Sequence, residues 1–167
     1  YPARLGVTDW IRSRFQGGRI PVDKKNPSGF TGGRRKFLAP KNALWMESKE
    51  VTIAELLKPA GYVSCHIGKW HLGADDWYPQ KQGYDFNYGG CDYGQPPSYF
   101  DPFNKPTHRH AMIRSGIPHL PGRKPGQYLS DREAEEAVAF IEKHKDKPFF
   151  LNMDNYGVHT PIHAKAE

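Results

Sequence analysis

The chain has 167 residues, of which 37% are hydrophobic and 13% aromatic, so it is long enough for one domain with a core and too aromatic for a disordered segment. No apolar run approaches the length of a membrane-spanning helix, and the absence of an initiator Met or signal-like stretch at Tyr1 predicts an internal piece of a longer protein. The 17 Gly and 15 Pro predict many turns and long loops.

The net charge of +6 is concentrated near the N-terminus. Residues 1 to 49 carry 11 Lys and Arg against 3 Asp and Glu, whereas residues 50 to 167 carry 13 against 15. A basic surface attracts polyanions such as nucleic acids or sulfated glycans. No zinc-finger spacing, aromatic RNA-binding motif or heptad accompanies the charge, so the sequence does not predict nucleic-acid binding. A glycan-binding surface and a solvated loop both stay open.

Residues 12 to 50 are interrupted throughout by Gly and Pro, so no helix or strand of ordinary length fits there. A loop of this length inside a compact domain usually has a function, which makes it a candidate wall of a substrate cleft.

The first predicted helix begins after Thr52, because Thr52 and Glu55 have the spacing of a capping box. The helix ends near Lys58-Pro59, since the residue before Pro avoids helical geometry, and Gly61 closes it. A short strand at residues 62 to 67 follows. The apolar face expected for the helix consists of Ile53, Leu56 and Leu57.

Residues 74 to 129 are rich in Gly, Pro, Tyr and Asp and predict a second long insertion. Asp75 and Asp76 favour a turn over a metal site. His108 and His110 resemble a metal pair only superficially, because no third ligand is within obvious reach. Asp92 and Tyr93 could reach a cleft, although nothing in the spacing fixes their direction.

A second helix is predicted from a capping box at Ser130 to Glu133 and runs out in the charged stretch 143 to 147. Residues 149 to 153 then form a mostly apolar run, typical of a strand buried on both faces of a parallel sheet. The apolar positions of this helix are Ala134, Ala137, Val138, Phe140 and Ile141.

Two units of helix followed by strand predict an α/β fold, a mostly parallel sheet flanked by helices with long loop insertions. In such folds the ligand binds at the carboxyl ends of the strands. Candidate site residues are therefore sought just after residues 67 and 153.

Lys69 and His71 follow the first strand between two glycines. If the stretch stays extended, both side chains project to one side, where a cation and an imidazole could bind a tetrahedral oxyanion. The alternative is a solvated Lys beside a His packed on Trp70. After the second strand, His159 is a candidate general acid, because Pro161 stiffens the backbone next to it, or else a structural histidine.

The two cysteines make a weak case for a disulfide and none for a metal site. Cys65 lies in the apolar strand and is expected to be a buried free thiol, whereas Cys91 lies in a Gly-rich loop.

The run GYVSCHIGKWHLG, from Gly61 to Gly73, resembles the second signature of the sulfatase family. Three further stretches are similar to that family in order and spacing, so the resemblance spans nearly the whole chain: YPARLGV at residues 1 to 7, GYDF at residues 83 to 86, and KPFF at residues 147 to 150 leading to HTP at residues 159 to 161. The resemblance implies an alkaline-phosphatase-like fold and hydrolysis of sulfate esters, of aryl groups or carbohydrates.

In the family, an oxidised Cys or Ser, converted to formylglycine, attacks the sulfur, and a calcium ion neutralises the sulfate oxygens. The resemblance implies that Lys69 and His159 bind the sulfate, that His159 protonates the leaving oxygen, and that His71 supports the nucleophile. Covalent catalysis, charge stabilisation and proton delivery give each role a physical basis.

Neither the nucleophile motif nor the calcium ligands occur in this chain, so we expect both cofactors to be held outside it. Residues 1 to 167 are therefore expected to form one incomplete sulfatase catalytic domain that is inactive alone, with no metal ligands of its own. The compartment stays unknown, and only the resemblance suggests secretion or a periplasmic location. Two alternatives are a phosphodiesterase or phosphonate hydrolase of the same superfamily and a non-catalytic polyanion-binding module at residues 12 to 41.

Overall fold

The computed structural model describes residues 5–7, 11 and 43–166. The predicted basic loop lies largely outside these residues. The helices and strands of the described part are α2 (Ile53–Leu57), β1 (Val63–Gly68), β2 (Phe86–Tyr88), α3 (Ala111–Ser115), α4 (Leu129–His144) and β3 (Phe149–Asp154). Single 3₁₀ turns occur at η1 (Lys58–Ala60), η2 (Asp75–Trp77) and η3 (Pro79–Lys81).

The three strands form a parallel sheet in the order β2-β1-β3. β1 is central and almost wholly buried, because it pairs with a strand on each side. The predicted α/β fold, a parallel sheet flanked by helices, is thereby confirmed. The sequence analysis missed β2, which is only three residues long and lies within the predicted insertion.

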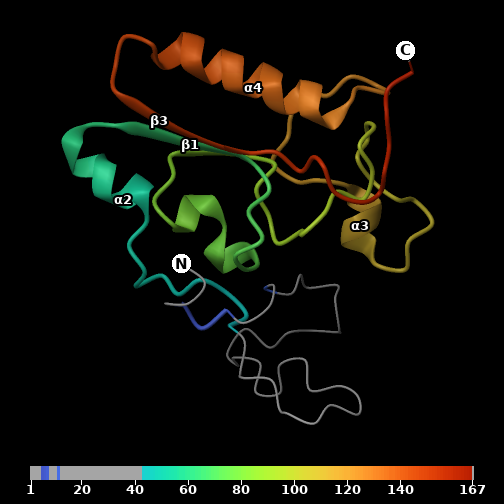
Figure 1. Cartoon of the computed structure of the whole chain (residues 1–167), viewed down its shortest axis with the longest axis horizontal. Coiled ribbons are helices and arrows are strands. Elements are labelled where there is room, and N and C mark those ends of the chain that lie inside the picture. The colour runs from blue at the N-terminus through green and yellow to red at the C-terminus, as the bar shows by residue number, and fades with distance from the viewer. Residues whose placement is uncertain (1–4, 8–10, 12–42, 167) are drawn as a thin grey trace.

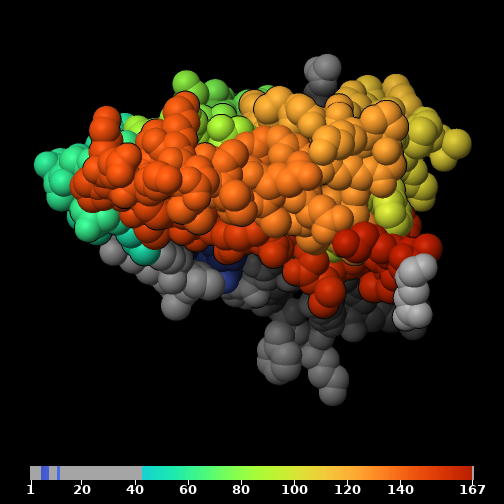
Figure 2. Space-filling view, turned by 90° about the horizontal axis from the view of Figure 1, so that it is seen from above, coloured from blue at the N-terminus to red at the C-terminus, as the bar shows by residue number. Residues whose placement is uncertain are grey.

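Helix α4 covers one face of the sheet, while the insertion fills the other (Figure 1). Seen from the side of α4, the helix spreads across much of the visible surface (Figure 2). Side chains of β1 alternate between the two faces, as the pleat requires. Cys65 and Ile67 pack against Ala137 and Phe140 of α4. His66 points to the opposite face, where its ring contacts those of Trp70 and Tyr84.

The predicted capping box of α2 is present. Thr52 donates its backbone N–H to Glu55 Oε2 at 2.7 Å, and the Thr52 hydroxyl accepts from the N–H of Glu55 at 3.2 Å. The predicted apolar face is wrong, however, since Ile53 is 48% exposed and Leu56 is 67% exposed. Ala54 is the residue of this helix that enters the core.

Two predictions for α4 also fail. The helix begins at Leu129, with Tyr128 as N-cap and no side-chain cap, so Ser130 lies inside the first turn and no Ser130 to Glu133 capping box forms. Val138 is 61% exposed, because the buried stripe includes charged residues. The buried positions of α4 are Leu129, Arg132, Glu133, Glu136, Ala137 and Phe140.

The burial predicted for the last strand is partly wrong. β3 pairs with β1 along its whole length but has no second partner among the described residues. Its first four residues are half-buried and the last two are exposed, with Met153 39% exposed. The edge position of β3 in the described sheet explains this pattern.

Candidate active site

The candidate site begins where β1 and β3 end side by side. Gly68 is paired with Asp154, and the backbone N–H of Lys69 donates to the Asp154 carbonyl at 2.6 Å. Gly68 has φ +92°, and a Cβ at this position would collide with that carbonyl. Glycine therefore permits the close approach of the two strand ends that sets the direction of Lys69.

Lys69 presents a partly dehydrated cation at this edge. Burial lowers the pKa of its amine, and the nearby Asp154 carboxylate opposes that shift. A cation with reduced hydration binds an anion more strongly than one in open water.

His71 does not follow the predicted extended path. Its φ is +58°, so the chain turns after Trp70 and the stretch does not stay extended, which was the condition for Lys69 and His71 to project to the same side of a strand. Two backbone hydrogen bonds hold this turn. The N–H of His71 donates to Cys91 O at 2.8 Å, and the carbonyl of Leu72 accepts from Met46 N.

The His71 imidazole is nevertheless in electrostatic contact with both other candidates. Burial lowers its pKa to about 4, helped by the charges of Lys69 and His159, while Asp92 and a backbone hydrogen bond with Ile11 oppose the shift. Nε2 of His71 is buried and has no hydrogen-bond partner among the described residues. At neutral pH, this ring is therefore a neutral imidazole with one ring nitrogen unpaired in that part of the chain.

His159 lies on the loop that follows β3, and its side chain is exposed. Its backbone N–H donates to the Tyr99 hydroxyl at 3.0 Å, and that hydroxyl donates to Tyr156 O at 2.7 Å. Nδ1 of His159 lies 3.1 Å from Thr160 Oγ1. The structure thus brings the three residues predicted from sequence, Lys69, His71 and His159, into one region at the carboxyl end of the sheet.

Sequence reasoning missed the groups that hold the His159 loop. Tyr99 comes from the insertion, and Glu133 of α4 accepts from Tyr156 N at 3.4 Å. Burial raises the pKa of Glu133 to about 7, against the lowering effect of that backbone bond. No local pattern could have identified either residue, whereas Asp154 could have been found from its place at the end of the predicted strand.

The competing residues take other places. Asp75 and Asp76 form the predicted turn in η2. Asp92 is buried and accepts from the Tyr78 hydroxyl at 3.0 Å. The Tyr93 hydroxyl donates to Met112 O at 2.8 Å.

The described residues contain neither a cluster of His, Cys, Asp or Glu suited to a metal ion nor an accessible cysteine. Within residues 5–7, 11 and 43–166, no three His, Cys, Asp or Glu side chains converge as metal ligands. Cys65 and Cys91 are both fully buried and form no disulfide among the described residues, as expected for Cys65, and burial raises the pKa of Cys65 to about 12. A formylglycine derived from either cysteine would be enclosed by the core.

Comparison with known proteins identifies the family. Residues 46–167 match the family model named Sulfatase, and the chain belongs to the sulfatase family. It is 30% identical over 160 residues to N-acetylgalactosamine-6-sulfatase of Homo sapiens, covering 92% of this chain and 30% of that protein. It is 29% identical over 171 residues to an arylsulfatase of Hemicentrotus pulcherrimus, covering 93% and 29%.

Two solved structures are similar to this chain. The crystal structure of Ps i-CgsB matches with a TM-score of 0.56 and 28% identity, over 71% of this chain and 29% of that one. Ps i-CgsB in complex with k-i-k-neocarrahexaose matches with a TM-score of 0.54 and 29% identity. The chain spans about 30% of the length of the curated relatives it matches. No helix in the described residues is long and apolar enough to cross a membrane.

Proposed function

We propose that this chain forms one wall of the sulfate site of a carbohydrate sulfatase, a sulfuric ester hydrolase. The observation that carries the proposal is the gathering of Lys69, His71 and His159 at the carboxyl ends of β1 and β3, in a chain of the sulfatase family. A carbohydrate sulfate is favoured over a simple aryl sulfate because relatives include N-acetylgalactosamine-6-sulfatases, and Ps i-CgsB was crystallised with an oligosaccharide.

Each residue has a role that its surroundings support. The Lys69 ammonium offsets the negative charge of the sulfate oxygens, and partial burial strengthens that interaction. His159, on an exposed loop, can deliver a proton to the leaving oxygen. His71, neutral and with Nε2 buried, can accept a hydrogen bond or a proton from a hydroxyl that reaches it. The nucleophile and the calcium ligands are expected outside this chain.

The test is a sulfatase assay on a protein of full family length that contains this chain. Lys69→Ala and His159→Ala should each lower kcat/KM for a sulfated saccharide by about a hundredfold or more, the size typical of losing a charge-stabilising group or a general acid. Lys147→Ala, which alters an exposed residue outside the three candidates, should leave kcat/KM nearly unchanged.

Two results would contradict the proposal. One is turnover of an aryl sulfate by the isolated 167-residue chain, because this would place a complete active site within it. The other is faster hydrolysis of a phosphodiester or phosphonate than of any sulfate ester, which would favour another hydrolase of the superfamily. Polyanion binding that survives Lys69→Ala and His71→Ala but is lost on neutralising Arg34, Arg35 and Lys36 would instead support the non-catalytic module.

A further inference from the structure

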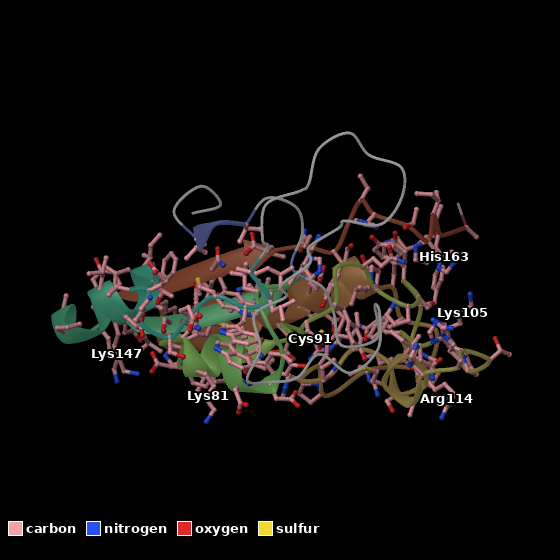
Figure 3. The ribbon with its side chains drawn as sticks, turned by 90° about the horizontal axis from the view of Figure 1, so that it is seen from below. Lys81, Cys91, Lys105, Arg114, Lys147 and His163 are labelled. Carbon is pink, nitrogen blue, oxygen red and sulfur yellow. The ribbon has the colours of Figure 1, made fainter. Side chains whose placement is uncertain are left out.

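A second basic region lies in the insertion, separate from the N-terminal loop. Between Asp101 and Asp131 the sequence contains no Asp or Glu, but it contains five Lys and Arg and three His. Residues 50 to 167 as a whole carry nearly equal numbers of basic and acidic residues, so this local excess of positive charge is not evident from their net charge. Figure 3 shows Lys105 and Arg114 at one end of the molecule with His163, and Lys81 and Lys147 at the opposite end.

The cations at this end form one cluster. The rings of His108 and His110 lie 5.4 Å apart, and Arg109 Nε donates to His110 Nε2 at 3.1 Å. Burial and the charges of His110, Lys105, Arg109 and Arg114 together lower the pKa of His108. Within the described residues, Lys105, Arg109 and Arg114 make no ion pair with a carboxylate. The positive potential of this cluster is therefore directed to solvent or to a bound anion.

Arg114 builds the loop that displays the cluster. Its Nη1 donates to His108 O at 2.9 Å and to Arg109 O at 3.1 Å, so one guanidinium holds two carbonyls of the same turn. The turn is closed further by His108 N donating to Lys105 O at 2.9 Å. Lys105 and His108 consequently project from a backbone that is fixed by several hydrogen bonds.

A pocket of about 240 Å³ lies between this cluster and Thr160, the residue next to His159. Thr160 on its wall lies 3.1 Å from Nδ1 of His159 through Oγ1, and the same hydroxyl donates to Gln95 Oε1 at 3.1 Å. The pocket lining is completed by Pro96, Pro97, Lys105, His108, Ile113 and Pro161. A general acid contacts the leaving group, so the sugar released by His159 would extend toward this pocket.

We propose that the pocket beside Thr160, with Lys105 and His108, is a subsite that binds a second sulfate on the leaving sugar or its neighbour. The inference rests on the proposed function, because it takes His159 as the acid that faces the leaving group. It adds a specificity, namely that multiply sulfated saccharides bind better than singly sulfated ones. Lys105 supplies the charge at the pocket wall, while Arg109 adds positive potential beside it.

The experiment measures, by titration calorimetry, binding of a disulfated disaccharide and of the same disaccharide without the second sulfate to the 167-residue chain. The wild-type chain should prefer the disulfated probe by roughly tenfold, as two exposed ion pairs would give. In Lys105→Gln/Arg109→Gln that preference should disappear. Arg114 is left intact because it holds the turn.

The matched control is Lys81→Gln/Lys147→Gln, which removes the same charge from exposed residues at the other end of the molecule (Figure 3). The inference is overturned if the control loses the preference equally, if Lys105→Gln/Arg109→Gln keeps it, or if neither probe binds at millimolar concentration. It is also overturned if an oligonucleotide of equal charge binds this cluster more tightly than the disulfated probe.

Lys69→Ala separates the two proposals. If this variant binds both probes more weakly and keeps their ratio, the sulfate site and the subsite act independently, as proposed. If Lys69→Ala changes nothing while Lys105→Gln/Arg109→Gln abolishes the preference, the proposed sulfate site is wrong although the basic pocket binds anions.

Discussion

A single hydroxyl group links the insertion to the loop that carries the candidate acid. Tyr99 is only 3% exposed, and its hydroxyl is used twice, as a donor to Tyr156 O and as an acceptor from His159 N. These two bonds fix the backbone at Tyr156 and at His159, on either side of Gly157 and Val158. The direction of the His159 imidazole therefore depends on Tyr99, which makes Tyr99 a positioning residue.

Tyr99→Phe should lower the free energy of unfolding by about 1–3 kcal/mol, because it removes two hydrogen bonds in a buried place. In a full-length protein, kcat should fall while KM for the sulfated substrate changes little, since the acid is displaced and the sulfate contacts remain. Urea unfolding and steady-state kinetics well below the melting temperature check these two effects.

The control is Tyr128→Phe, which removes a hydroxyl that donates to His163 O in an exposed place. It should leave kcat unchanged. Equal kcat values for Tyr99→Phe and the wild type would show that Tyr99 is only structural.

At the scale of elements, the site depends on how closely the ends of β1 and β3 approach. Gly68 and Gly126 both have positive φ, but only Gly68 lies against another backbone. Comparing alanine substitutions at the two glycines therefore separates the free-energy cost of a positive φ from the cost of a steric collision with the Asp154 backbone.

Gly68→Ala should destabilise the fold by about 3 kcal/mol or more, because an added methyl group would force the strand ends apart. Gly126→Ala should cost roughly 1–2 kcal/mol, the strain of the left-handed conformation alone. Thermal unfolding of both variants measures the difference. Equal losses would mean that the close approach at Asp154 contributes nothing to stability.

Elements with a strong local pattern could be predicted from the sequence. β1 and β3 are apolar runs bounded by Gly or Pro, and their observed limits lie within one residue of the expected ones. β2 has only three residues and offers no recognisable period. The buried face of α4 was only partly predicted: Ala137 and Phe140 are buried as expected, but Arg132 pairs there with Glu136, and a hydrophobicity pattern cannot anticipate a buried charge pair.

The same distinction applies to the site. Lys69 and His71 follow a predicted strand within a recognisable motif, so they could be found. Tyr99 reaches His159 across 60 positions in sequence, and only the folded chain reveals that contact.

At the scale of the whole molecule, three buried titratable groups set opposing pH dependences. Burial lowers the pKa of His66 and of His71 from 6.5 to about 4, and raises that of Glu133 from 4.5 to about 7. The unfolded chain binds protons at both histidines between pH 6.5 and 4, so stability falls as the solution becomes more acidic. The unfolded chain releases the Glu133 proton first, so that contribution is lost as pH rises from 4.5 to 7.

These three groups together predict that stability rises from pH 4.5 to about 7 and is nearly constant above that. Below about pH 7, the two histidines together outweigh the single carboxyl group, and each of the three groups contributes up to roughly 3 kcal/mol for its full shift. Above about pH 7, the remaining deprotonation of the unfolded histidines and the ionisation of Glu133 nearly cancel. Urea unfolding at several pH values between 4.5 and 7.5 tests the profile.

Glu133→Gln should make the loss of stability on the acid side steeper, because it removes the opposing contribution of Glu133. His71→Gln should make the acid side less steep. A free energy of unfolding that stays constant from pH 6.5 to 4.5 would contradict the assignment of buried neutral histidines.

The reactivity of the two buried cysteines can be used to measure local unfolding of the layers that cover them. Cys65 lies between the sheet and α4, and Cys91 lies in the other cluster, where its Sγ is 3.4 Å from the Tyr156 hydroxyl. Because neither sulfur is accessible in the folded chain, an alkylating reagent can react only after the surrounding layer has separated. The rate at Cys65 then measures detachment of α4, and the rate at Cys91 measures release of the insertion from the opposite face, so the two layers can be timed separately.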